Sequence, residues 1–225
     1  MGKYGKEIIM RKKKLFKKLL PVLAIATVMA IGGIAAYFTA SDSVINTWTV
    51  GSVEIDLMEE AYDAATDERF NISPNKLLTK DPKVKNTGNS DAYVFLRLTV
   101  PKADVCVASQ NGLRTDQCVQ ELFEYTINPS WVLINEEIGI DENTYVFAYG
   151  TAEACRVLAP EAVTATLFEG DQIRFKNVIE GQGLERESLE MPVDAFAIQT
   201  TDLGDGTVTS PAAVWAILEN QIASI

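Results

Sequence analysis

The stretch Ala92-Tyr-Val-Phe-Leu-Arg-Leu-Thr-Val100 decides the fold class of this chain. Its apolar residues recur at every second position, and side chains two residues apart lie on the same face of a strand. Four apolar residues share one face: Val94, Leu96, Leu98 and Val100. Arg97 and Thr99 share the other face. The pattern therefore predicts a strand with one buried and one polar face.

The same alternation recurs later in the chain, between stretches rich in turn-forming residues. The further alternating runs are 145–149, 163–167, 173–179 and 196–198. Turn signals separate the runs, among them Asn86-Thr-Gly-Asn89, Glu169-Gly-Asp171 and Asp202-Leu-Gly-Asp-Gly206. Many short strands between turns are typical of a β-sandwich. We therefore expect residues 37–225 to form a single all-β sandwich domain.

Two segments have helical rather than strand spacing. Thr115 could cap a short helix over Asp116–Tyr125. At the C-terminus, Ser210 is a good N-cap and Pro211 suits a first helical position. The expected C-terminal helix carries a stripe with Trp215 on its flank, formed by Val214, Ile217, Leu218 and Ile222. We expect this stripe to pack on the sandwich; a partner-binding helix is the alternative.

The N-terminus has the layout of a secretory leader. Eight basic residues precede Leu19, and 22 uncharged residues follow from Leu19 to Ala40. A basic head, an apolar middle and small residues at the far end indicate a signal peptide over residues 1–36. The cleavage region would contain Ala35, Ala36 and Ala40. An uncleaved membrane anchor is the alternative, since 22 residues can cross a bilayer.

Removal of the leader makes the chain strongly acidic. The whole chain has 20 Lys and Arg against 31 Asp and Glu, and the leader holds eight of the bases and one acid. The remaining 12 bases and 30 acids give a net charge of −18. Such a surface repels nucleic acid and anionic membranes. We expect a secreted or cell-surface protein that binds no nucleic acid and meets the membrane only through an uncleaved leader.

The first strand-like run, residues 44–57, changes phase at a glycine. Its apolar residues fall on even positions before Gly51, at Trp48 and Val50. They fall on odd positions after it, at Val53, Ile55 and Leu57. One face can stay buried only if the strand bends near Gly51, which glycine permits. Such a strand could pass between two sheets or two subunits; an ordinary edge strand is the alternative.

Residue usage narrows the possible chemistry. The chain has no histidine, which excludes Ser-His-Asp and Cys-His catalysis and the His-Glu-x-x-His zinc helix. No motif predicts a catalytic residue, a cofactor or a metal ligand. Three cysteines leave an odd count: Cys106 and Cys118 could bridge a polar loop, with Cys155 left over, or all three could be free.

Two matches resemble a known family. Gly33-Ile-Ala-Ala-Tyr-Phe38 followed by Trp48-Thr-Val-Gly-Ser-Val-Glu-Ile-Asp56 resembles the leader and first strand of the TasA/camelysin family, secreted by Gram-positive bacteria. Residues 72–80, leading to 84–97, are similar to the family's Pro-Gly-x-x-x segment, strand, Asn-x-Gly and next strand. Asn75 stands where the family has glycine.

The resemblance implies a jelly-roll-like sandwich with one or two short helices, and processing by a SipW-type signal peptidase. For TasA it implies a biofilm matrix fibre, in which the N-terminal strand of one subunit completes a sheet in the next. The assembly strand would carry Trp48, Val50, Val53, Ile55 and Leu57. The camelysin branch implies a cell-surface metalloprotease instead. A monomeric surface-anchored adhesion domain is a third alternative.

Overall fold

The central element of the fold is β4 (Ala92–Val105), which contains the alternating stretch that predicted it. The computed structural model describes residues 51–68, 70, 72–109, 111–184, 188–203 and 208–222, all within one compact unit, Val50–Ile225. β4 belongs to an antiparallel sheet of order β10-β4-β8-β7, and β5 pairs with its far end. These partners are β5 (Cys118–Glu121), β7 (Trp131–Ile138), β8 (Glu142–Tyr149) and β10 (Val193–Gln199).

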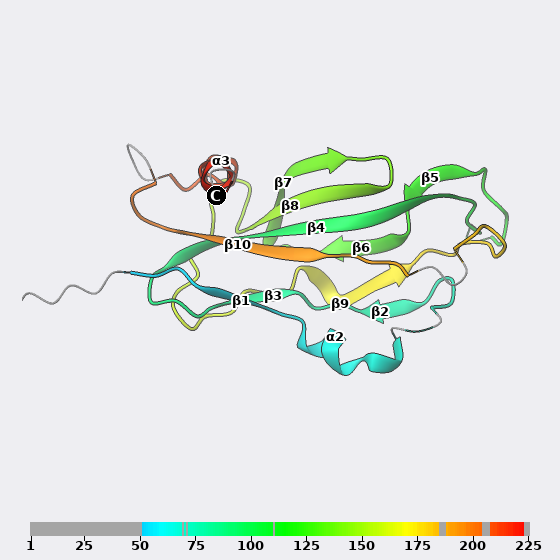
Figure 1. The fold of residues 1–225 in the computed structure, drawn as a ribbon, viewed down its shortest axis with the longest axis horizontal. Coiled ribbons are helices and arrows are strands. Elements are labelled where there is room, and N and C mark those ends of the chain that lie inside the picture. Colours follow the sequence, from blue (N-terminus) through cyan, green and yellow to red (C-terminus); the bar gives the residue numbers. More distant parts are fainter. Residues whose placement is uncertain are drawn as a thin grey trace, which may run out of the picture. The chain divides into compact units, whose positions relative to one another are not determined.

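The second layer consists of short antiparallel strands. β2 (Leu77–Thr79), β9 (Phe168–Phe175) and β6 (Phe123–Ile127) form a three-stranded sheet of order β2-β9-β6. β1 (Ile55–Met58) pairs with β3 (Lys83–Asn86). Figure 1 shows β1, β3, β2 and β9 on the opposite side of β10 and β4 from β7 and β8. The predicted all-β, sandwich-like fold is confirmed.

The main core lies between these layers. The four inward residues predicted on β4 are all 0% exposed: Val94, Leu96, Leu98 and Val100. Arg97, on the opposite face, is partly exposed and forms an ion pair of 2.9 Å with Asp194 of β10. The predicted division of this strand into two faces is therefore correct over its central part.

A second core on the outer face of β4 was not expected from the sequence. Tyr93 and Phe95 point to the side opposite Val94 and are 4% and 0% exposed. They are covered by α3 (Pro211–Ile222), the predicted C-terminal helix, which begins at Pro211 as expected. Its Val214, Trp215 and Leu218 are buried, whereas Ile222 is 41% exposed. The stripe thus packs on the sheet over the first two turns, with Trp215 inside it.

The helix predicted over Asp116–Tyr125 is wrong. The structure has β5 and β6 in this region, paired with β4 and β9. Thr115 caps no helix; its hydroxyl accepts a hydrogen bond of 3.0 Å from the backbone N–H of Val107. Pairing with distant strands overrides the local helical spacing, because strand formation depends mainly on tertiary context. The run 163–167 also forms no strand, apart from an isolated bridge between Val163 and Lys85.

Asparagine residues lie in two turns of the described backbone, of which the Asn86–Asn89 turn was predicted from the sequence. Asn75 has a φ of 65°, in the left-handed region that glycine adopts most readily and asparagine next. Asn86 is 0% exposed, and its side chain donates to the carbonyls of Ser90 and Leu158 and accepts from the N–H of Gly88. It thereby fixes the Asn86–Asn89 turn.

Two short helices near the N-terminus, α2 (Glu60–Ala64) and the 3-10 turn η1 (Thr66–Glu68), were not expected individually.

Candidate functional site: the open side of the sandwich

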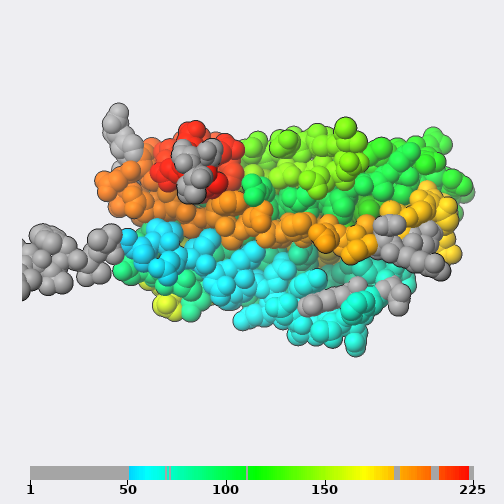
Figure 2. Space-filling model, in the orientation of Figure 1, coloured from blue at the N-terminus to red at the C-terminus, as the bar shows by residue number. Residues whose placement is uncertain are grey.

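β10 ends its sheet and leaves one hydrogen-bonding edge open. Among the described strands it pairs only with β4. Because the N–H of Thr99 donates to the carbonyl of Pro192, and antiparallel pairs alternate, residues 194, 196 and 198 bond to β4. The N–H and C=O groups of Val193, Ala195 and Ala197 consequently point away from β4. Figure 2 shows the surface of β10 beside that of β1 on this side.

β1 is the neighbouring edge, in the other layer. Its Ile55 and Leu57 are half-buried against the main core, and Val53 is half-buried just before it. Backbone hydrogen bonds also fix the residues preceding β1: Glu54 O accepts from Thr87 and Gly88, and Ser52 N donates to the Asn89 side chain at 2.7 Å. Residues 52–58 are therefore bonded to and packed against the same chain to which they belong.

Of the five predicted assembly residues, Val53, Ile55 and Leu57 lie in this segment. Trp48 and Val50 fall outside the described residues, as do the predicted cleavage residues Ala35, Ala36 and Ala40.

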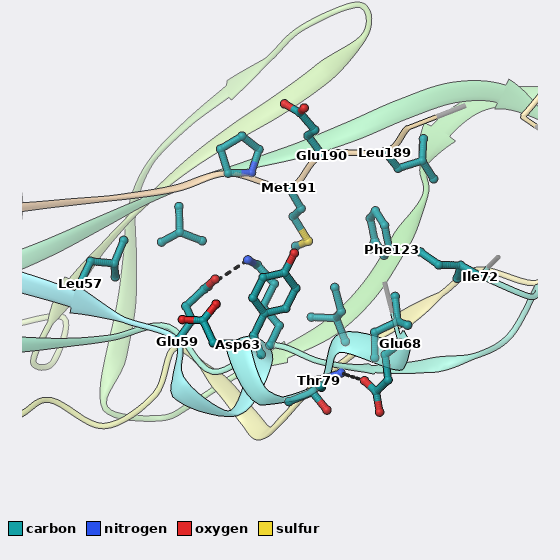
Figure 3. A pocket seen from close by; sticks show the side chains of 17 residues that line it. Leu57, Glu59, Asp63, Glu68, Ile72, Thr79, Phe123, Leu189, Glu190 and Met191 are labelled. Carbon is teal, nitrogen blue, oxygen red and sulfur yellow. Dashed lines mark hydrogen bonds and ion pairs between the residues drawn. The ribbon is translucent and has the colours of Figure 1, made fainter. Parts of the chain in front are cut away.

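A cavity of about 520 Å³ opens where β1 ends. Beyond Met58 the chain turns into α2, and within the described residues β2 pairs only with β9, so no described strand pairs with its other edge. The lining is largely apolar and includes Leu57, Ile72, Leu78, Phe123, Ile173, Leu189, Met191 and Val193. Figure 3 shows Met191 pointing into the cavity and Glu190 pointing away from it. The cavity thus joins the start of the open β10 edge to the main core.

Charged side chains hold α2 beside the cavity, and two of them, Glu59 and Lys80, line it. Asp81, only 3% exposed, accepts hydrogen bonds of 3.0 and 2.9 Å from the N–H groups of Ala61 and Tyr62. Asp81 therefore satisfies two backbone N–H groups in the first turn of α2, as a capping side chain would, although it belongs to a later segment of the chain. Lys80 is 7% exposed, pairs with Glu59 at 2.9 Å and lies over the Tyr62 ring at 5.2 Å. This burial is tolerable because the ammonium is paired.

Another wall of the cavity is formed by β2, at the edge that does not pair with β9. The N–H of Thr79 points away from β9 and donates to Glu68 Oε2 at 2.7 Å (Figure 3). That hydrogen bond lowers the pKa of Glu68, since it stabilises the ionised carboxylate. Glu68 thus occupies the position that a carbonyl of a neighbouring strand would take.

The opposite end of the larger sheet, β7, is protected. Its pairing with β8 is shifted by a bulge between Leu133 and Asn135, and Glu136 and Glu137 follow. Bulges and charges are the usual means by which edge strands avoid pairing with other chains. The two ends of this sheet therefore differ: β10 has an apolar cavity beside it, and β7 has a bulge and two carboxylates.

Polar groups elsewhere form no recognisable catalytic centre in the described part of the chain. Tyr145 and Asn143 both donate to Glu121 Oε1, joining β8 to β5. No group of three potential metal-ligating His, Cys, Asp or Glu residues occurs within the described ranges. All three cysteines are free: Cys106 and Cys155 are buried, and Cys118 is exposed.

Comparison with known proteins adds no relative: no family model, curated protein or solved structure matches the chain. None of the helices within the described ranges is long and apolar enough to span a bilayer.

The sequence predicted a strand over residues 44–57, of which the described part forms a strand only at Ile55–Met58, while residues 51–54 form none and residues 44–50 lie outside the described ranges. It did not predict the cavity beside this strand. The cavity exists because α2 replaces a continuation of β1, and α2 is held by Asp81 and Lys80 from another segment. The local signal for α2 was the Glu- and Ala-rich run after Met58. No sequence pattern indicated which β-strand would end the sheet, because strand order follows from tertiary pairing.

Proposed function

We propose that this protein is a secreted structural subunit of extracellular matrix fibres, such as those of a biofilm. Subunits assemble when the N-terminal strand of one adds to the open side of the next. The observation that carries the proposal is the open edge of β10 beside an apolar cavity. Cleavage of the leader by a SipW-type signal peptidase would release that strand.

The chemistry of the N-terminal segment fits this acceptor. Apolar and polar residues alternate from Thr47 to Val50, and in an extended strand Val44, Trp48 and Val50 lie on one side together with Asn46. A strand added to an edge gains main-chain hydrogen bonds from the sheet, and its alternate side chains enter pockets beside that edge. The outward N–H and C=O groups of Val193 and Ala195 would supply the hydrogen bonds. The cavity beside them would receive Trp48.

The first experiment compares residues 37–225 with residues 51–225, which retain the whole described fold. We expect the longer protein to form fibres visible by negative-stain microscopy, and the shorter one to remain a folded monomer. A synthetic peptide of residues 37–50 should bind the shorter protein and raise its Tm with peptide concentration. Fibres of normal length and number from residues 51–225 would rule out the proposal.

Matched variants locate the two partners of the contact. Trp48→Asp should reduce fibre formation at least tenfold, because it places an unpaired charge in an apolar cavity. Thr47→Asp puts the same charge on the opposite side of the strand and should have a smaller effect.

On the acceptor, Ala195→Pro removes an outward N–H and no bond to β4, so it should block addition without unfolding the sheet. Glu136→Pro makes the same change on the open edge of β7, where the N–H also points outward. It should leave fibre formation intact. Equal loss in both proline variants would argue against β10 as the acceptor.

A further inference from the structure

The segment 59–68 covers part of the acceptor cavity without being packed into the core. It contains α2 and η1, and neither element has a buried residue. By contrast α3, the other helix described, buries four of its residues. Tyr62, Asp63, Ala65 and Glu68 nevertheless all line the cavity.

Four hydrogen-bonded or ionic contacts, each with a carboxylate, attach this segment to residues 79–83, which comprise the end of β2, the start of β3 and the residues between them; the Lys80 ammonium also lies over the Tyr62 ring. Asp81 accepts from the N–H groups of Ala61 and Tyr62. Two ion pairs add to this, Glu59 with Lys80 at 2.9 Å and Glu60 with Lys83 at 2.8 Å. The fourth contact is Glu68 with the N–H of Thr79. A segment with little buried apolar surface opens at a low free-energy cost.

The surface beneath the segment has the character of a binding site rather than of solvent-facing sheet. Leu78, Phe123 and Ile173 line the cavity and belong to the main core. The open edge of β2 lies next to them, and Glu68 occupies its outward N–H at Thr79. Movement of the segment would therefore widen the apolar cavity and free a strand edge at the same time.

We propose that residues 59–68 form a lid, held by carboxylate contacts, whose opening admits the partner strand to the acceptor cavity. The proposal rests on the proposed function, because it concerns the regulation of that same site. Opening breaks the four contacts together, since α2 and η1 are continuous in the chain. The lid accordingly limits the rate of strand addition in the free subunit.

Amide exchange measured by NMR on residues 51–225 tests the lid without requiring fibres. Glu68→Ala removes the contact to Thr79 only. If the segment moves as a unit, the variant should accelerate exchange at Ala61 and Tyr62 at least tenfold, although neither amide bonds to Glu68. The Leu96 amide of β4 should be unchanged. Asp67→Ala, an exposed neighbour with the same change of charge, should leave the exchange rates of Ala61, Tyr62 and Leu96 within about twofold of the wild type.

Faster exchange at the Thr79 amide alone would overturn the lid proposal. It would show that only the hydrogen bond between Glu68 and Thr79 was lost and that the segment does not move as a unit. Fibre growth is the second readout: with residues 37–225, Glu68→Ala should shorten the lag at least threefold relative to Asp67→Ala. If Glu68→Ala accelerates exchange at Ala61 and Tyr62 but leaves the lag of fibre growth unchanged, the lid does not control strand addition and that part of the proposal is overturned. If no variant forms fibres, the proposed function fails, while the exchange rates still decide whether the segment moves as a unit.

Discussion

Trp215 of α3 packs against Phe95 of β4, with ring centroids 5.3 Å apart and planes inclined by 51°. Trp215 also meets Phe196 of β10 edge to face at 5.6 Å. The C-terminal helix is thus joined by aromatic contacts to the two strands at the open end of the larger sheet. As a result β4 is buried on both faces over residues 92–96, where α3 covers its outer side.

Trp215→Ala should be strongly destabilising. Removal of a large buried aromatic side chain lowers the free energy of unfolding by about 3–5 kcal/mol. Urea unfolding of residues 51–225 measures the loss. Ile222→Ala, on the exposed end of the same helix, should change it by less than about 0.5 kcal/mol. Equal effects of the two changes would contradict the packing of α3 on the sheet.

Leu96→Ala tests the inner face of β4. The side chain is 0% exposed, so its truncation should cost about 2–5 kcal/mol in the same assay. Thr99→Ala alters the opposite face of the strand and should cost far less. A loss below about half a kcal/mol for Leu96→Ala would place this residue outside the core.

Asn86→Ala should destabilise the turn that follows β3. The side chain makes three hydrogen bonds in a buried site, and the change leaves the Ser90 and Leu158 carbonyls without that donor. We expect a loss of about 2–4 kcal/mol, since buried unpaired groups cost more than exposed ones. Asn89→Ala removes an exposed hydrogen bond to Ser52 and serves as the control. A similar small loss in both variants would show that Asn86 is not essential to the turn.

Stability should fall at alkaline pH in part through Tyr145. Burial, together with its hydrogen bond to the Glu121 carboxylate, raises the pKa of Tyr145 from 10.0 to about 12. The unfolded chain therefore loses this proton near pH 10, while the folded chain keeps it until about pH 12. The contribution is fully present below pH 10 and declines as the pH rises between these two values. Urea midpoints across this range should fall less steeply for Tyr145→Phe; parallel profiles would contradict the assignment.

Ala36→Arg should block removal of the leader. Signal peptidases require small residues beside the cleavage site, and Ala35, Ala36 and Ala40 are the small residues we expect there. Mass spectrometry of the exported protein should find an N-terminus within a few residues of Ala36 in the wild type. The variant should be retained at the membrane as an intact chain. Wild-type protein recovered only with Met1 at its N-terminus would contradict cleavage.

The sequence predicted most reliably those features that depend on neighbouring residues. Alternation at Val94–Val100 identified the central strand, and Ser210-Pro211 located the start of α3. The turn at Asn86-Thr-Gly-Asn89 also followed from local chemistry. The segment 116–125 was mistaken for a helix because its spacing fits both structures, and only pairing with β4 and β9 decides between them. The acceptor cavity was not predictable for the same reason, since Lys80, Phe123 and Met191 meet there only after folding.

The protected edge of β7 has a consequence for the stoichiometry of the proposed polymer. A subunit with one donor strand and one acceptor edge is a bifunctional monomer, and bifunctional monomers grow into unbranched chains. A second edge able to accept a strand would make the subunit trifunctional and lead to branching or gelation. The bulge at Leu133 and the carboxylates of Glu136 and Glu137 therefore favour linear growth. In such a polymer, residues 51–225 act as a chain stopper: they accept a strand but offer none, so mean fibre length should decrease as their mole fraction rises.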